Sequence, residues 1–277
     1  MVELNEARLH ELTVILYALS VLFYFIDFIH NNRKANRTAF WLLAFVWVLQ
    51  TLFLTFRLIE TGRFPVLTLL EGLYFYVWVL VTLSLIINRL LRVDFIVFFT
   101  NVLGFFIMSI HTFAPDQHGS QVIAGQLVSE LLMIHITMAI LSYGAFSLSS
   151  AFSLLYLLQH NLLKKKRWGK RLLRIEDLSK LDHMSYVLNV IGVPMLLLSL
   201  LLGVLWAYIK LEQFIWYDAK VLGSFSVLLA YSFYLYRRVV NGLQGKSISL
   251  LNVAAFLILL INFFLFGSLS RFHLWIS

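Results

Sequence analysis

The chain has 277 residues, of which 61% are hydrophobic and only 13% charged, and its formal net charge is +8. This composition excludes an ordinary soluble domain, because repeated apolar runs of about 20 residues are long enough to cross a bilayer as helices. The lack of cysteine excludes disulfides, thiolate metal sites and cysteine nucleophiles. We therefore predict an all-α, polytopic membrane helical bundle in which residues 1–277 form a single transmembrane domain.

Eight apolar runs are predicted to be transmembrane helices: 11–29, 40–57, 66–87, 94–112, 124–159, 185–209, 219–236 and 249–269. At about 1.5 Å per residue, each run is long enough to cross the hydrocarbon layer. The fifth run is too long for one perpendicular crossing. Its helix either tilts strongly, extends beyond the membrane, or begins with a loop-like segment near Gly125.

The loops between these runs predict the orientation of the chain. Loops 30–39, 88–93, 160–184 and 237–248 hold most of the 22 lysines and arginines. Because cytoplasmic loops are enriched in these residues, we expect both termini to lie outside. The same bias explains the net positive charge, so we predict no nucleic-acid partner.

A carboxylate lies inside the third run, where Glu71 follows Phe64 and Pro65. One interpretation is a buried carboxylate that is protonated or paired with an arginine such as Arg57 or Arg63. The other is a path for protons or substrate through the membrane. The sequence leaves both open.

His135 lies in the fifth run, within the segment LLMIHITMAILSYGAF. An imidazole in this apolar setting needs a partner to offset its desolvation. That partner is either a neighbouring helix, through a hydrogen bond, or a metal or haem iron. In the second case His273 completes a ligand pair, with His111 as its alternative. Further along the same run, Ala145, Ser149 and Ser153 recur every four residues and predict a seam of close helix packing.

The segment LLKKKRWGKRLLRIEDLSKLDH lies in the most basic loop, 160–184. It anchors the loop inside, and an interfacial helix with Trp168, Leu172 and Leu173 would rest on anionic membrane lipid. The alternative is a docking surface for an acidic cytoplasmic partner.

The stretch from Gly203 to Tyr236 consists of an apolar helix end at Trp206, a short loop and a second apolar helix. Charged residues interrupt it, so the loop must lie at a water interface, where aromatic rings also concentrate. The predicted orientation puts this loop outside, where a flat apolar ligand would find a platform. The residues of the interruption are Lys210, Glu212, Trp216, Tyr217 and Asp218.

Soluble-type active sites are not indicated. The chain has no phosphate-binding glycine loop, no His-Glu-x-x-His zinc motif and no Gly-x-Ser-x-Gly elbow. We therefore predict a binding protein and not an enzyme.

Several separated motifs from about Gly62 onward occur together in one known family. They are Gly62-Arg63-Phe64-Pro65 with Glu71 and Trp78; Met133-Ile134-His135 through Ser142-Tyr143; Leu181-Asp182 with Ser185-Tyr186; Gly203 with Trp206-Ala207; and Trp216, Asp218 and Lys220. In these residues the chain resembles the cytochrome c assembly superfamily, the membrane haem-handling proteins with a tryptophan-rich outer loop. It resembles most closely the HemX-type branch of that superfamily.

The chain also departs from the haem-delivering members of this family. Those members carry more tryptophans, a Trp-x-Trp-Asp-Pro-Lys-Glu run and a further tryptophan in the helix after it. The positions that depart from this pattern here are Leu211, Ile215, Tyr217, Ala219, Val221 and Gly223. Their intramembrane histidines correspond to Ser84 and Tyr236. The resemblance thus implies a reduced haem platform that senses or holds haem more readily than it delivers it.

The resemblance implies haem b at the outer boundary of the membrane, with its iron between His135 and His273. The ring would lie on Trp206, Trp216 and Tyr217, beside Asp218, and the propionates would lie near Arg63, Lys210, Lys220 or Arg271.

The implied function is that of a haem-responsive regulator in the bacterial cytoplasmic membrane. It would lower the level of glutamyl-tRNA reductase in tetrapyrrole biosynthesis, with loop 160–184 as the contact to that partner. The alternatives are a haem carrier for cytochrome c assembly and a scaffold whose ligand site has decayed.

Overall fold

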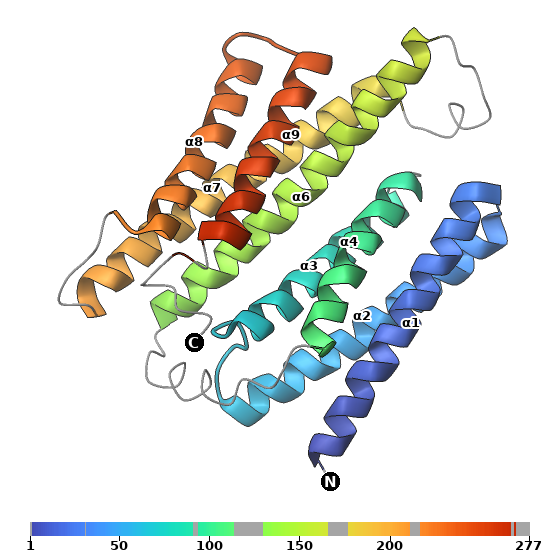
Figure 1. The fold of residues 1–277 in the computed structure, drawn as a ribbon, viewed down its shortest axis with the longest axis vertical. Helices are drawn as coiled ribbons and strands as arrows, with labels where there is room; N and C mark the ends of the chain where they lie inside the picture. The colour runs from blue at the N-terminus through green and yellow to red at the C-terminus, as the bar shows by residue number, and fades with distance from the viewer. Residues whose placement is uncertain are drawn as a thin grey trace. The chain divides into compact units, whose positions relative to one another are not determined.

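The computed structural model describes residues 2–30, 32–90, 94–113, 130–165, 177–210, 217–266 and 269. This part of the chain is helical and contains no strand. Its long helices are α1 (Val2–His30), α2 (Arg33–Thr61), α3 (Leu69–Leu90), α4 (Asp94–Phe113), α6 (Glu130–Lys164), α7 (Leu178–Lys210), α8 (Ala219–Val239) and α9 (Lys246–Ile261) (Figure 1). A π-helical segment, η2 (Asn262–Phe266), follows α9 directly.

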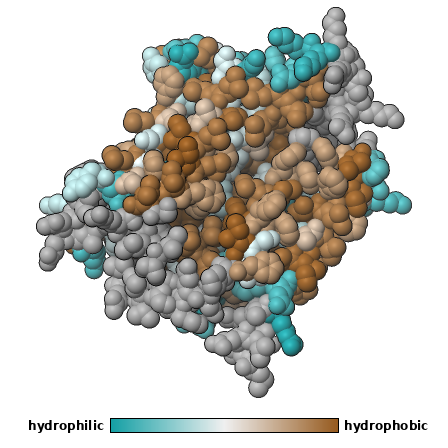
Figure 2. All heavy atoms as spheres, viewed as in Figure 1, coloured by the Kyte–Doolittle hydropathy of each residue, from teal (hydrophilic) through white to brown (hydrophobic). Residues whose placement is uncertain are grey.

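Each of these eight helices is long and apolar enough to cross a membrane. The prediction of eight spans in an all-α, multi-pass membrane protein is therefore confirmed. Apolar residues cover the helices and polar ones gather near helix ends, as a space-filling view shows (Figure 2). The side on which the termini lie stays a prediction.

The fifth predicted span is a continuous helix of 35 residues, α6. At about 1.5 Å per residue it is about 52 Å long, well over the ~30 Å of a hydrocarbon layer. Part of α6 therefore extends beyond the apolar layer unless it tilts strongly. Gly125, where we considered a loop-like start, lies outside the described residues.

The chain divides into two compact units, Met1–Gln117 and His118–Ser277. In the first unit α1 packs on α2 and α4, and α3 packs on the same two helices. The second unit repeats this arrangement, with α6 and α8 each packing on α7 and α9. Each unit is thus a ring of four helices; the prediction of a single domain over 1–277 stays a prediction.

Glu71 connects the loop before α3 to the helix itself. Both carboxylate oxygens accept hydrogen bonds from the Arg63 guanidinium at 3.0 Å, and one also accepts from the backbone N–H groups of Leu67 and Thr68 at 3.0 and 3.1 Å. Of the two interpretations of Glu71, pairing with an arginine is confirmed, and Arg63 is that arginine. The carboxylate stabilises the start of α3, because it accepts hydrogen bonds from backbone N–H groups that have no partner within the helix.

The small-residue seam of α6 packs against α7 and α9 through hydroxyl groups. Ser149 donates to the Ser185 carbonyl at 2.8 Å, and the side-chain nitrogen of Asn252 lies 2.8–2.9 Å from the hydroxyls of Ser149, Ser153 and Ser185. All four residues are buried. The predicted seam is confirmed, and hydrogen bonds across it join three helices where no water is available to replace them.

Candidate haem site

His135 lies near the start of α6, where this helix crosses α7. Its ring occupies the space that a side chain at Gly203 would fill, since a Cβ added there would lie 2.6 Å from His135 Cε1 and 2.7 Å from Nδ1. Real Cβ atoms do not approach other atoms so closely. Glycine at position 203 is therefore what lets the imidazole enter the interface between α6 and α7.

One nitrogen of the imidazole is fixed by the facing helix. His135 Nδ1 lies 2.6 Å from the carbonyl oxygen of Ser199, which is buried, and the Ser199 hydroxyl donates to the His135 carbonyl at 2.8 Å. Because a carbonyl can only accept, Nδ1 must carry the proton, and in a neutral ring Nε2 then keeps its lone pair. The hydrogen bond between helices that we considered for His135 is thus confirmed.

This hydrogen bond is also of the kind that metal-binding histidines make. Histidines that bind metals usually donate their other ring N–H to a carbonyl or carboxylate, which fixes the tautomer and the direction of the ring. Nε2 of His135 has no hydrogen-bond partner among the described residues. The donor set therefore fits one axial ligand to a haem iron.

The start of α8 is fixed by Asp218, Lys220 and the π-helical segment. Asp218 accepts from the Lys220 backbone N–H at 2.9 Å, and the Lys220 ammonium donates to the Asn262 carbonyl at 3.0 Å. The Asn262 side chain donates to the Tyr143 hydroxyl on α6 at 3.1 Å. These contacts join the start of α8 and the end of α9 to Tyr143, which lies within α6.

The predicted aromatic platform is described only in part. Trp206, one turn after Gly203, is buried, with 6% of its surface exposed, whereas Tyr217 is 82% exposed. Trp216 and His273 lie outside the described residues. Of the predicted platform, the structure therefore describes one buried indole, that of Trp206, and one exposed phenol ring, that of Tyr217.

The remaining predicted residues lie elsewhere. Arg63 belongs to the first unit, where it binds Glu71. His111 also belongs to that unit, on α4, and Arg271 lies outside the described residues. The structure therefore places His135, Trp206, Asp218 and Lys220 in the second unit, and Arg63 and His111 in the first.

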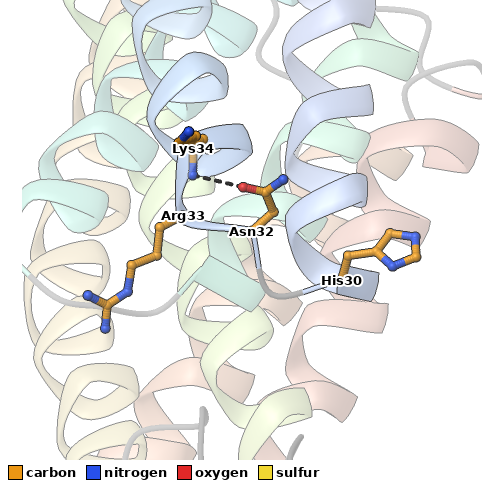
Figure 3. A pocket seen from close by; sticks show the side chains of 4 residues that line it. All are labelled: His30, Asn32, Arg33 and Lys34. Carbon is orange, nitrogen blue, oxygen red and sulfur yellow. Dashed lines mark hydrogen bonds between the residues drawn. The ribbon is translucent and has the colours of Figure 1, made fainter.

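An open hollow at the turn between α1 and α2 is a different feature. His30, Asn32, Arg33 and Lys34 line it, and the His30 and Arg33 side chains point in different directions (Figure 3). Asn32 already accepts hydrogen bonds from the backbone N–H groups of Lys34 and Ala35 at 3.0 and 3.3 Å. The helix start is thus capped, and the hollow has the features of a solvated turn.

Sequence reasoning missed the groups that hold His135. Ser199 and Gly203 are spaced four residues apart, the pattern of small residues that predicts a close helix contact. That pattern was a usable signal for the face of α7 that meets α6. The π-helical turn at Asn262 gives no comparable signal.

Comparison with known proteins supplies the family. The model of the family described as cytochrome C assembly protein matches residues 66–274. The chain belongs to this family. Protein HemX of Bacillus subtilis (strain 168) is 67% identical over 277 residues, which is all of both chains. Protein HemX of Brevibacillus brevis is 48% identical over 96% of this chain and 97% of its own.

A more distant relative belongs to the same family. Cytochrome c biogenesis protein CcsA of Prochlorococcus marinus (strain MIT 9301) is 28% identical, over 83% of this chain and 81% of its own. The predicted resemblance to the cytochrome c assembly superfamily, and to its HemX-type branch, is thereby confirmed.

Proposed function

We propose that this family member binds haem b through His135 and acts as a haem-responsive regulator of tetrapyrrole biosynthesis in the bacterial cytoplasmic membrane. The observation that supports haem binding is the fixed imidazole, whose Nδ1 lies 2.6 Å from the Ser199 carbonyl while Nε2 remains available. Haem, when bound, would supply an iron that takes an imidazole nitrogen as a ligand. The protein's part is to hold that imidazole in one tautomer and one direction.

His273 is the proposed second ligand. Trp206, Trp216 and Tyr217 would border the macrocycle, and Asp218 and Lys220 would fix the start of α8 beside it, as their hydrogen bonds to Lys220 N–H and the Asn262 carbonyl support. The charge of Lys220 also suits a propionate group. A propionate contact by Arg63 stays a prediction.

The regulatory part rests on the resemblance to the HemX-type branch and on the charge of loop 160–184. In this proposal haem occupancy changes how the loop meets a cytoplasmic partner, and the level of glutamyl-tRNA reductase falls. The loop would also rest on anionic membrane lipid through its lysines and arginines.

A haem carrier for cytochrome c assembly is the second candidate. The observation in its favour is the relationship to the CcsA protein, a cytochrome c biogenesis protein by name. A carrier needs haem to leave the site toward an acceptor, whereas a regulator needs only occupancy.

Haem binding is tested on the detergent-solubilised protein by titration with haem and visible spectroscopy. We expect a bis-histidine spectrum in the wild type and its loss in both His135→Ala and His273→Ala. His183→Ala is a matched control, because His183 lies exposed on α7. Failure of the wild type to retain haem would refute the proposal.

Regulator and carrier are separated in cells. Neutral substitutions at Lys164, Lys165, Lys166 and Arg167 are expected to raise the reductase level while haem binding by the purified protein stays normal. A reductase level that does not change, with the variant protein present in normal amount, would contradict the regulatory role.

A further inference from the structure

Two histidines meet inside the first unit. His10 on α1 and His111 on α4 have ring centroids 5.1 Å apart, with an interplanar angle of 48°. The Tyr74 ring on α3 lies 5.5 Å from His10 and 5.1 Å from His111, and the Phe53 ring on α2 lies 4.3 Å from His10. All four helices of the unit thus contribute to an aromatic pocket around two imidazoles.

The polar atoms of these imidazoles are not paired with protein groups. Neither ring makes a hydrogen bond to any described residue; the contacts of both are to aromatic rings. His111 Nδ1 in particular is buried without a hydrogen-bond partner. Burying the His111 nitrogen in this way costs free energy. A ligand that both nitrogens can bind would offset it.

The distance between the rings discriminates between possible ligands. A metal ion bound to a ring nitrogen at about 2.0–2.1 Å lies about 3.2 Å from the centre of that ring. Two rings that bind one ion at the tetrahedral angle then have centres about 5.2 Å apart, whereas rings on opposite sides of one iron have centres about 6.4 Å apart. The observed 5.1 Å matches the ring spacing of the tetrahedral arrangement and is shorter than that of two rings on opposite sides of one iron.

We propose that His10 and His111 together bind one divalent transition-metal ion of the Zn²⁺ class. Imidazole suits such ions, and the tetrahedral angle is the one that Zn²⁺ adopts most often. No group of three or more histidine, cysteine or acidic side chains forms a metal cluster within the described residues. Water therefore takes the remaining positions, which makes this an open, exchangeable site and not a closed structural one.

A nearby positive charge acts against the ion. The charge of Arg57 on α2 reaches both imidazoles. Its guanidinium is itself held by Glu60 at 3.0 Å, and the carboxylate offsets part of the charge. Arg57 thus weakens the site without blocking it. Replacing it by a neutral residue is expected to strengthen binding, which distinguishes a bound cation from a bound anion.

The proposal is tested on the full-length, metal-free protein in detergent, with Co²⁺ as a spectroscopic substitute for Zn²⁺. We expect one Co²⁺ per chain, with the intense visible bands of tetrahedral coordination, displaced by Zn²⁺. His10→Asn and His111→Asn should each weaken binding at least about tenfold, since each removes one of two ligands. Arg57→Gln should bind at least as tightly as the wild type, and His183→Asn should bind like it.

Several results would overturn the proposal. These are a wild type that binds no stoichiometric Co²⁺, a variant series in which all proteins bind alike, and an Arg57→Gln protein that loses the ion. A second measurement covers variants that fail to fold: in the wild type, Zn²⁺ should protect His10 and His111 from carbethoxylation by diethyl pyrocarbonate, detected by mass spectrometry. Equal modification with and without Zn²⁺ would likewise refute the site. Because His135 belongs to the second unit, these results do not depend on haem binding.

Discussion

Gly203→Ala perturbs the candidate site without touching the histidine itself. The new Cβ would lie 2.6 Å from His135 Cε1, 2.7 Å from Nδ1 and 3.2 Å from Nε2, so the ring must retreat by roughly 1 Å to reach ordinary contact. A shift of that size stretches the 2.6 Å contact with the Ser199 carbonyl beyond hydrogen-bond range. Overpacking costs about 1–3 kcal/mol and the lost hydrogen bond about 1 kcal/mol, so we expect a loss of about 2–4 kcal/mol in the free energy of unfolding.

The assay combines thermal unfolding followed by circular dichroism with haem titration of the same preparation. Gly192→Ala is the matched control, because its Cβ would lie 2.6 Å from Phe146 Cε1 on the same pair of helices. We expect both variants to be destabilised and only Gly203→Ala to bind haem more weakly. If Gly203→Ala unfolds and binds haem like the wild type, the account of His135 is wrong.

Three further substitutions test the packing of the two units. Asn252→Ala leaves the seam hydroxyls without their shared donor and should lower the free energy of unfolding by about 1–3 kcal/mol, measured by denaturation in mixed detergent. Arg63→Gln should lower the free energy of unfolding by about 1–3 kcal/mol, because it removes the partner of the Glu71 carboxylate. A double-mutant cycle with Glu71→Gln should show that most of this loss is coupling between the two side chains. Additive effects of the two substitutions would contradict the role of this ion pair. The Asp182 carboxylate lies 2.5 Å from the Arg238 guanidinium. Asp182→Asn should weaken this ion pair and so speed proteolysis of the loop between α8 and α9. An unchanged rate of cleavage would show that the ion pair does not hold this loop.

The sequence predicts the eight helices well because their hydropathy is strong and their lengths match a bilayer. It predicts helix faces poorly, since a helix that is apolar on all sides carries little information about which side meets protein and which meets lipid. Ser149 and Ser153 identified one face of α6 through their small size. Their partner Asn252 was not predicted, because a lone asparagine in an apolar run is compatible with any neighbouring helix.

The candidate site shows the same limit: the sequence can identify a polar residue that needs a partner, but not which group that partner is. His135 was recognisable as a polar group that needs a partner, but its partner is the backbone carbonyl of Ser199, which no side-chain pattern identifies. For Glu71 the sequence left open a protonated carboxyl, an arginine partner such as Arg57 or Arg63, and a path for protons or substrate. The structure pairs it with Arg63, eight residues earlier, where the left-handed turn at Gly62, with φ 63°, redirects the chain. The pairing of His10 with His111 required the packing of α1 on α4, which sequence spacing does not reveal.

The central claim is that His135 binds haem iron through Nε2 because Ser199 fixes Nδ1. Electron paramagnetic resonance of the ferric protein after incubation with haem tests it most directly, with wild type, His135→Ala and His183→Ala treated alike. The account predicts a low-spin signal with two nitrogen axial ligands in the wild type and in His183→Ala, and a high-spin signal or loss of haem in His135→Ala. An identical low-spin signal in all three proteins would contradict it.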